Sequence, residues 1–249
     1  MEPNRVINTP GSWLKLLIAT AVAFALFHVL GAALHSDRGQ FGLVVGFVIV
    51  ATTVALDALL FTSHPLVSAQ DLGLGVPAWS GILIAVALAA LLVATFPVYS
   101  WMASSSLELY PGWISLLPGL FAQSGIAEET LFRGFVFGHL RRGRRFWRAA
   151  AVSAIPFVIV HLFMFVTLEW PIALAGLLLS VAISFPLARL FELGGRTIWA
   201  SALLHFVVQG AIKILTVSGT NSAVFPLVWM ILCAVFPFAV FLFRRHDPT

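Results

Sequence analysis

Two adjacent glutamates and an arginine stand in a segment that is otherwise apolar enough to enter a membrane: Glu128, Glu129 and Arg133. Ionisable side chains at bilayer depth cost about 2.5–3.5 kcal/mol each, so they usually pair or serve a function. Glu129 and Arg133 are four residues apart, and on a helix they face each other in the favourable acid-before-base order. Glu128 points about 100° away and has no such partner on its own helix. An unpaired carboxylate at this depth predicts a functional site.

Two histidines in later apolar segments lie at a depth similar to that of Glu128. At about 1.5 Å per helical residue, Glu128 and His161 are about 20 Å, and His205 about 14 Å, from the arginines at the ends of their segments, which are Arg141, Arg148 and Arg196. One carboxylate and two imidazoles can ligate Zn²⁺ and leave a position open for water. Alternatively, Glu128 can act as a general base on water without a metal, with a histidine holding the nucleophile. Both alternatives give hydrolysis. Gln209, one turn after His205, can donate its amide to a developing oxyanion.

The composition places the chain among polytopic membrane proteins. Of the 249 residues, 60% are hydrophobic and only 10% are charged, with a mean hydropathy of +1.01. A soluble domain of this length cannot bury so much apolar surface. A single cysteine, Cys233, excludes an intramolecular disulfide. The net charge of +4 comes largely from one arginine cluster, so it indicates lipid headgroups and membrane topology rather than nucleic acid.

Apolar runs of about twenty residues predict eight membrane-spanning helices in one all-α domain, residues 1–249. The expected spans are residues 13–34, 41–62, 79–102, 113–139, 147–168, 171–191, 196–216 and 224–243. Within the long polar connection 63–80, residues 72–75 are expected to form a short interfacial piece. His28 and Asp57 lie within spans and lack spaced partners, which favours structural roles, and His139 is expected to be an ordinary interface residue at a helix end.

The arginines predict the orientation of the bundle. Five of them lie between the fourth and fifth spans: Arg141, Arg142, Arg144, Arg145 and Arg148. The positive-inside rule places this connection in the cytoplasm. With eight spans, both termini and most of the fourteen lysines and arginines then fall on the same side. We therefore expect cytoplasmic N- and C-termini, with lipid binding by the cluster as the alternative.

Three motifs, taken together, resemble a known family. They are Glu128-Glu129-x-x-x-Arg133, Phe157-x-x-x-His161, and His205 followed four residues later by an amide. In order and spacing they look like the signature of the CPBP (CAAX protease and bacteriocin-processing, Abi) intramembrane metalloproteases, which are related to type II CAAX prenyl endopeptidases. The resemblance covers roughly residues 118–209, within a family-like core of about 113–216. It implies an eight-helix bundle whose membrane-embedded cavity opens toward the cytoplasm.

The resemblance also implies roles for these residues. Glu128 and His161 would activate the water, and His205 and Gln209 would stabilise the oxyanion. Glu129 and Arg133 would support the site, while Phe157 packs beneath His161 without taking part in chemistry. The family has been treated both as zinc-dependent, with Glu128, His161 and His205 as ligands, and as glutamate-dependent. This chain departs from the family pattern at Gln209, where Asn or Asp is usual; the extra methylene moves the amide outward.

The sequence therefore predicts a multi-pass endopeptidase of a prokaryotic plasma membrane. It would cleave a hydrophobic or lipidated, CAAX-like peptide near the cytoplasmic membrane face, and its partners would be the bilayer and this substrate rather than nucleic acid. Two alternatives stay open. Gln209 favours a non-catalytic immunity or scaffold member of the same fold. A proton-coupled transporter would use the Glu–His cluster as a relay, but it predicts inverted repeats, and none is evident.

Overall fold

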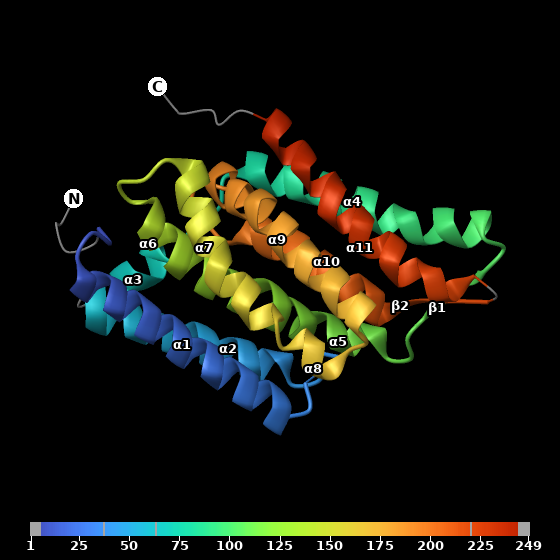
Figure 1. Cartoon of the computed structure of the whole chain (residues 1–249), viewed down its shortest axis with the longest axis horizontal. Coiled ribbons are helices and arrows are strands. Elements are labelled where there is room, and N and C mark those ends of the chain that lie inside the picture. Colours follow the sequence, from blue (N-terminus) through green and yellow to red (C-terminus); the bar gives the residue numbers. More distant parts are fainter. Residues whose placement is uncertain (1–5, 37, 63, 220, 244–249) are drawn as a thin grey trace.

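The structure, a computed structural model, describes residues 6–36, 38–62, 64–219 and 221–243. Its helices run along one long axis (Figure 1). The first half of the chain contains α1 (Pro10–Ala33), α2 (Gly42–Asp57) with its π-helical continuation η2 (Ala58–Thr62), the short α3 (Pro65–Asp71), and α4 (Trp79–Met102). The helix that follows consists of α5 (Trp113–Leu120), the π-helical η3 (Phe121–Ala127) and η4 (Thr130–Phe137), and α6 (Gly138–Arg141).

The second half completes the bundle with α7 (Phe146–His161), α8 (Met164–Thr167), α9 (Trp170–Leu193), α10 (Trp199–Ile214) and α11 (Phe225–Val235), the last flanked by the 3-10 turns η5 (Ser222–Val224) and η6 (Phe236–Leu242). Six of the described helical segments are long and apolar enough to cross a membrane. The predicted all-α membrane bundle is therefore confirmed. The predicted span 113–139 is also helical but carries the polar motif residues, and the predicted span 196–216 contains α10, which has only 16 residues.

Two local predictions need correction. Residues 72–75 are a turn, and the short helix is α3, immediately before them. Pro65 starts α3 because its fixed φ suits the first helical turn, and Gly73 follows its end with a positive φ of 81°. The sequence also gave no indication of two short antiparallel strands, β1 (Ser106–Leu109) and β2 (Leu215–Ser218), paired with Ser106 opposite Ser218.

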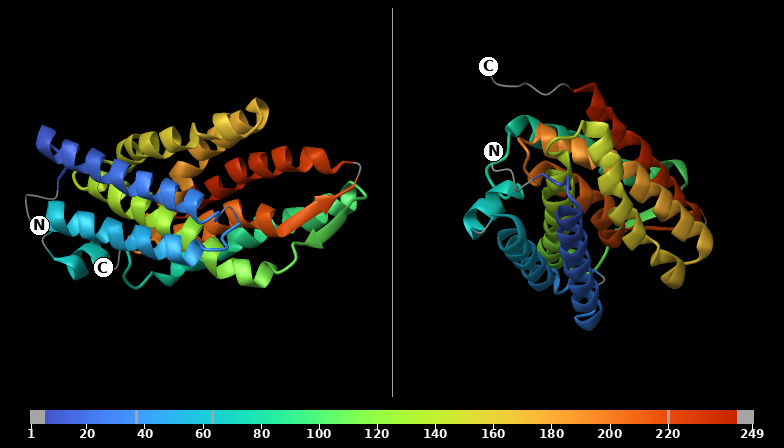
Figure 2. Two further views of the ribbon diagram at one scale, coloured as in Figure 1. Left: turned by 90° about the horizontal axis from the view of Figure 1, so that it is seen from below. Right: turned by 60° about the vertical axis from the view of Figure 1, so that its left-hand side comes forward.

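Most connections that carry arginine gather at one end of the bundle, which we call the arginine end; Arg38 lies at the other end, where it donates to the Lys213 carbonyl at 3.0 Å. At the arginine end, the Arg144 guanidinium donates to the Ile7 carbonyl at 2.5 Å, and Arg189 donates to the Phe243 carbonyl at 2.8 Å. Arg141 pairs with Glu192 at 2.5 Å. The two strands lie at the opposite end, far from α3 and α6 (Figure 2). The chain thus places these arginines on one side, as predicted, whereas the identity of that side stays a prediction.

Small residues let the motif-bearing helix approach its neighbours closely. A Cβ added at Gly42 in α2 would clash with the Gly119 carbonyl of α5, and one at Gly134 would clash with the Leu72 carbonyl. Such glycines permit the close backbone contacts that hold helices together in a membrane. Gly134, the residue after Arg133 in the motif, therefore sets the position of the helix 113–141, which carries both glutamates.

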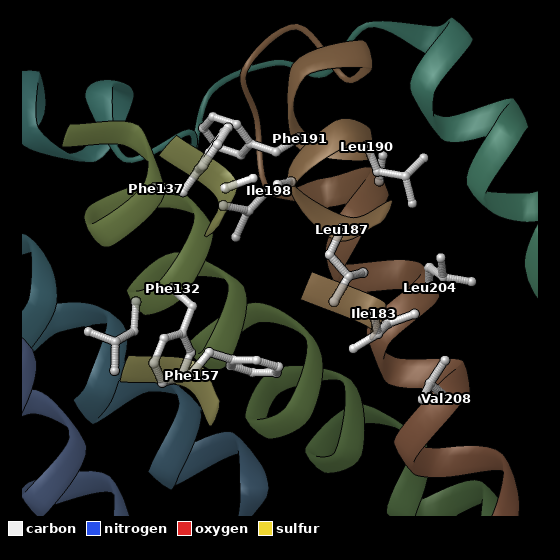
Figure 3. Packing of buried hydrophobic residues seen from close by; sticks show 14 of the residues in the cluster. Phe132, Phe137, Phe157, Ile183, Leu187, Leu190, Phe191, Ile198, Leu204 and Val208 are labelled. Atoms are coloured by element: carbon white, nitrogen blue, oxygen red, sulfur yellow. The ribbon is translucent and has the colours of Figure 1, made fainter. Parts of the chain in front are cut away.

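One buried hydrophobic cluster runs through the centre of the bundle. Figure 3 shows Phe132 and Phe157 side by side in it, with Ile183, Leu204 and Val208 from α9 and α10 across from them. The rings of Phe132 and Phe157 meet edge to face, with centroids 4.9 Å apart. This packing fixes the helix that carries Glu128 against the helix that carries His161.

Asp57 does have a partner. Its Oδ1 lies 2.6 Å from Nε2 of His139, and both side chains are almost completely buried. The His139 ring also contacts Phe61, with centroids 4.3 Å apart. The expectation that His139 is an ordinary interface residue is therefore wrong. The pair links α2 to the end of the motif-bearing helix across 82 residues of sequence, which is why helical spacing did not reveal it.

Candidate active site

The helix that carries Glu128 and Glu129 is π-helical on both sides of the two glutamates. The segments η3 and η4 end one residue before Glu128 and begin one residue after Glu129. π-Helical turns are rare and occur frequently at functional sites, because they re-aim side chains that a regular α-helix would place elsewhere. Here both carboxylates reach α10, although they are adjacent in sequence.

Glu129 is the buried centre of a charged chain. Its Oε1 accepts a hydrogen bond from Nδ1 of His205 at 2.7 Å and lies 3.1 Å from a guanidinium nitrogen of Arg133. Arg133 is 3% exposed and stacks over the Phe157 ring, with its guanidinium carbon Cζ 4.3 Å from the centroid of that ring. The aromatic face and the carboxylate together compensate a cation held out of water. The carboxylate at Nδ1 also fixes the tautomer of His205, which leaves a lone pair on Nε2.

Glu128 faces the other side of the same imidazole. Its Oε2 is 3.7 Å from Nε2 of His205. The side-chain amide of Gln209 donates to the two carboxylate oxygens at 3.2 and 3.3 Å, and its nitrogen is 2.8 Å from Nε2 of His205. Gln209 thus bridges the carboxylate and the imidazole. Glu128 is 14% exposed, whereas Glu129 is fully buried, so Glu128 is the carboxylate that a substrate or water can reach.

His161 approaches from the end of α7. Its Nδ1 donates to the Phe157 carbonyl at 2.6 Å, which leaves Nε2 with a lone pair. The Phe157 ring lies 4.6 Å from the His161 ring and 5.8 Å from the His205 ring, between the two. His161 and Glu128 line the same cavity and are close enough to interact electrostatically. Phe157 therefore positions both histidines by packing, and its backbone orients one of them.

The cavity has a volume of about 630 Å³ and walls that are predominantly apolar. This volume is in the range of small-ligand sites, which are mostly apolar with a few oriented polar groups. Side chains from α1, α7, α9, α10 and α11 line it, and its polar groups include Glu128, His161, His205 and Gln209. The structure therefore brings the four predicted catalytic residues to one cavity, which Phe157 also lines, while Glu129 and Arg133 lie behind it.

The cavity extends away from the arginine end. Its lining begins at Phe24 in α1, Phe157 in α7 and His205 in α10, and continues toward the ends of these helices that lie far from the arginines. From α9 and α11 it takes residues of the halves nearest the opposite end, such as Ile172 and Pro226. The cavity lining therefore lies in the half of the bundle away from the arginine end, and its opening toward the cytoplasm stays a prediction.

The three predicted zinc ligands are not arranged as a metal site. Among the residues that the structure describes, no three His, Cys, Asp or Glu side chains form a group that could hold a metal ion. The Gln209 amide donates a hydrogen bond to the lone pair of His205 Nε2, and the same amide also donates to the Glu128 carboxylate. Gln209 would have to turn away before both could ligate Zn²⁺. This arrangement favours the metal-free alternative, and Zn²⁺ binding stays a prediction.

Sequence reasoning missed one charged residue of the cavity. This residue is Lys213, near the end of α10. A signal was available: Lys213 follows Gln209 by four residues, as Gln209 follows His205, so the three share one helix face.

The comparison with protein families agrees with these motifs. A family model described as type II CAAX prenyl endopeptidase Rce1-like matches residues 110–211. The matched segment begins at Tyr110, three residues before α5, runs almost to the end of α10 and includes all three motifs, from Glu128 to Gln209. No curated protein and no solved structure matches the chain. Residues 110–211 are therefore similar to the type II CAAX prenyl endopeptidase Rce1-like family.

Proposed function

We propose that the protein is a membrane-embedded endopeptidase that hydrolyses a peptide bond of a hydrophobic or lipidated, CAAX-like substrate. One observation carries this proposal. The side chains of Arg133, Glu129 and His205 interact in a row, and a second carboxylate, Glu128, lies beside them within reach of an apolar cavity. An acid that orients one nitrogen of an imidazole, while the other nitrogen faces the reaction, is a recurring arrangement in hydrolases.

Water activation falls to Glu128 and His161. A water molecule held between the Glu128 carboxylate and Nε2 of His161 can give its proton to Glu128 as its oxygen attacks the carbonyl carbon. His161 is suited to hold this water because its Nδ1 is bound to the Phe157 carbonyl, so that Nε2 is the acceptor. No metal is needed for this step.

His205 and Gln209 act on the charge that develops next. The Gln209 amide has two N–H groups, which allows it to donate to the oxyanion while remaining near Glu128. For this step His205 takes up a proton from solvent at Nε2 as the Gln209 amide turns from Nε2 to the oxyanion; the Nε2–H then donates to the oxyanion, and the Glu129 carboxylate at Nδ1 stabilises the positive charge. The proton taken up by Glu128 is then delivered to the leaving amine. Glu129 and Arg133 contribute by holding His205 in this orientation.

The walls of the cavity support the choice of substrate. Large apolar side chains such as Phe24, Ile172 and Trp229 surround the polar groups, and burial of apolar surface stabilises a bound apolar chain by about 25 cal/mol per Å². A hydrophobic or lipidated peptide that arrives through the bilayer fits these walls, and nucleic acid does not. We place the protein in the plasma membrane of a prokaryote, with cleavage near one face. The cavity lies in the half of the bundle away from the arginine end, so experiment must determine which face this is.

The test is cleavage of fluorogenic hydrophobic and farnesylated peptides by the purified protein in proteoliposomes. We expect turnover by the wild type and its loss in Glu128→Gln, His161→Gln and His205→Gln, with unchanged thermal unfolding for Glu128→Gln. Mass spectrometry of the products identifies the cleaved bond. Equal product formation by wild type and Glu128→Gln would contradict the proposal.

A non-catalytic role in the same fold is the second candidate. It is favoured by Gln209, whose amide occupies both the carboxylate and the imidazole that a reaction would use. A scaffold or immunity protein would keep its cellular effect when Glu128 is replaced by Gln, whereas a peptidase would lose it. The same variant therefore separates the two candidates.

A further inference from the structure

Two arginines at the start of α7 have no partner in the described part of the chain. The side chains of Arg145 and Arg148 are exposed, and neither guanidinium group forms a hydrogen bond or an ion pair with a described residue. The preceding Arg141 and Arg144 differ, because the first pairs with a buried carboxylate and the second donates to two backbone carbonyls. Two guanidinium groups at the arginine end are therefore available to a partner outside the protein.

Trp147, which lies between these two arginines in the sequence, marks their level in the membrane. Its side chain is 58% exposed, and its ring stacks on Phe241 with centroids 5.0 Å apart and planes inclined by 19°. Exposed tryptophans of membrane proteins are enriched at the level of the lipid headgroups. Because the stacked ring fixes the start of α7, the two arginines lie at the level where lipid phosphates are found.

The helix face that carries Arg148 continues as an exposed apolar stripe into the membrane. Helix α7 starts at the arginine end (Figure 1), and Ile155 and Ile159 follow Arg148 on the same face, 56% and 58% exposed. At about 1.5 Å per residue, Ile159 is about 16 Å along the helix from Arg148. This length is about half of a hydrocarbon core of about 30 Å, which is the depth of one leaflet. A lipid acyl chain can therefore lie along Ile155 and Ile159 while its headgroup lies beside Arg148.

The charge of the two arginines selects among headgroups. A planar guanidinium group binds phosphate oxygens through two parallel N–H donors. A zwitterionic headgroup has its own ammonium group to compensate its phosphate, whereas an anionic headgroup has a net negative charge left for the protein. Each cation near a membrane surface strengthens binding of anionic lipid by about fivefold, so two cations give about 30-fold.

We propose that Arg145 and Arg148 bind the headgroup of one anionic phospholipid, whose acyl chain lies along Ile155 and Ile159. The apolar stripe favours a lipid over free phosphate, because phosphate has nothing to place against it. The lipid lies against α7, which ends at His161 in the candidate active site. The inference does not depend on the proposed peptidase function, since lipid binding requires no reaction.

The experiment is native mass spectrometry of the full-length protein in a neutral detergent. The protein is titrated with phosphatidylglycerol or with phosphatidylcholine of the same acyl chains, and the dissociation constant of the first bound lipid is measured. We expect the wild type to bind phosphatidylglycerol about 30-fold more tightly than phosphatidylcholine. Equal affinity for the two lipids would overturn the inference.

The variants assign this preference to α7. Arg148→Gln should lower the preference about fivefold, and Arg145→Gln/Arg148→Gln should remove it. The chain offers a matched control, because Arg196, in the connection between α9 and α10, is also exposed. Arg196→Gln removes the same charge and should keep the preference. An equal loss in Arg148→Gln and Arg196→Gln would show general attraction to the charged surface and would refute a site on α7.

Two further measurements test the apolar part of the site and the kind of ligand. Ile155→Ala/Ile159→Ala should weaken binding of both lipids by the same factor, because it removes apolar contact and leaves the arginines. Inorganic phosphate should not displace phosphatidylglycerol; displacement would show a site for a free anion instead of a lipid. All four substituted positions on α7 are exposed, so the unfolding temperature without added lipid should equal that of the wild type. Unchanged binding of both lipids by Ile155→Ala/Ile159→Ala would contradict the proposed position of the acyl chain.

Discussion

Replacing Glu129 by Gln should destabilise the protein strongly and stop its reaction. Glu129 is fully buried, and its charge compensates Arg133, two of whose guanidinium nitrogens have no hydrogen-bond partner among the described residues. Breaking a buried ion pair on one side typically costs about 3–5 kcal/mol, because the remaining charge stays in a low-dielectric environment. The same change removes the carboxylate that fixes the tautomer of His205, and the corresponding change in a Ser-His-Asp hydrolase lowers kcat by about 10⁴-fold.

The double variant Glu129→Gln/Arg133→Met separates these two effects. Removing both charges leaves no uncompensated cation, so most of the lost stability should return, to within about 1–2 kcal/mol of the wild type. Peptide cleavage should stay low, since His205 still lacks its carboxylate. The free energy of unfolding is measured by denaturant titration in mild detergent, and kcat with a fluorogenic peptide in proteoliposomes. If activity returned together with stability, Glu129 would have a structural role only, and the proposed mechanism would be refuted.

Three further predictions concern the same helices. Gln209→Asn shortens the side chain whose amide bridges Glu128 and His205 at 2.8–3.3 Å. A displacement of the amide near 1 Å should lower kcat by about 10²-fold, with little change in thermal unfolding. Unchanged turnover would exclude an oxyanion role for Gln209. Asp57→Ala leaves His139 buried without its partner and should cost about 1–3 kcal/mol in a denaturant titration, whereas Asp57→Ala/His139→Leu should recover part of that loss. The Gln209 amide hydrogen-bonds two of the three candidate zinc ligands, Glu128 and His205. Chelators should therefore leave cleavage unchanged, and metal analysis should find no stoichiometric zinc. A loss of activity on chelation that Zn²⁺ restores would support the metal-dependent alternative.

Much of the fold followed from the sequence because lipid leaves the backbone few choices. Every polar backbone group of a membrane-spanning segment must be bonded within it, so an apolar run of about twenty residues becomes a helix. The predicted span 79–102 coincides with α4, and the predicted span 171–191 lies within α9. The short helix α3 and the strands β1 and β2 were not predicted, because they lie in connections where no period of apolar residues exists.

The residues of the candidate site, and their similar level along the helices, could be proposed from spacing alone. Counting along helices placed Glu128, His161 and His205 at similar distances from the arginines, and the structure brings all three to one cavity. Their catalytic roles stay a prediction until variants are assayed. The pairing of Glu129 with Arg133 also follows from spacing within one helix, where the geometry is fixed by the 3.6-residue repeat.

Contacts between helices were decided by the tertiary structure alone. The rotation and tilt of helices that are distant in sequence decide which glutamate bonds to His205 and how Gln209 bridges Glu128 to His205. They also decide in which half of the bundle the cavity lies. The π-helical turns beside the glutamates change that rotation, and no spacing rule anticipates them. The sequence by itself determined the helices and the depth of their polar residues, because both depend on position along one chain; the direction in which each side chain points depends on packing between chain segments, which only the folded bundle fixes.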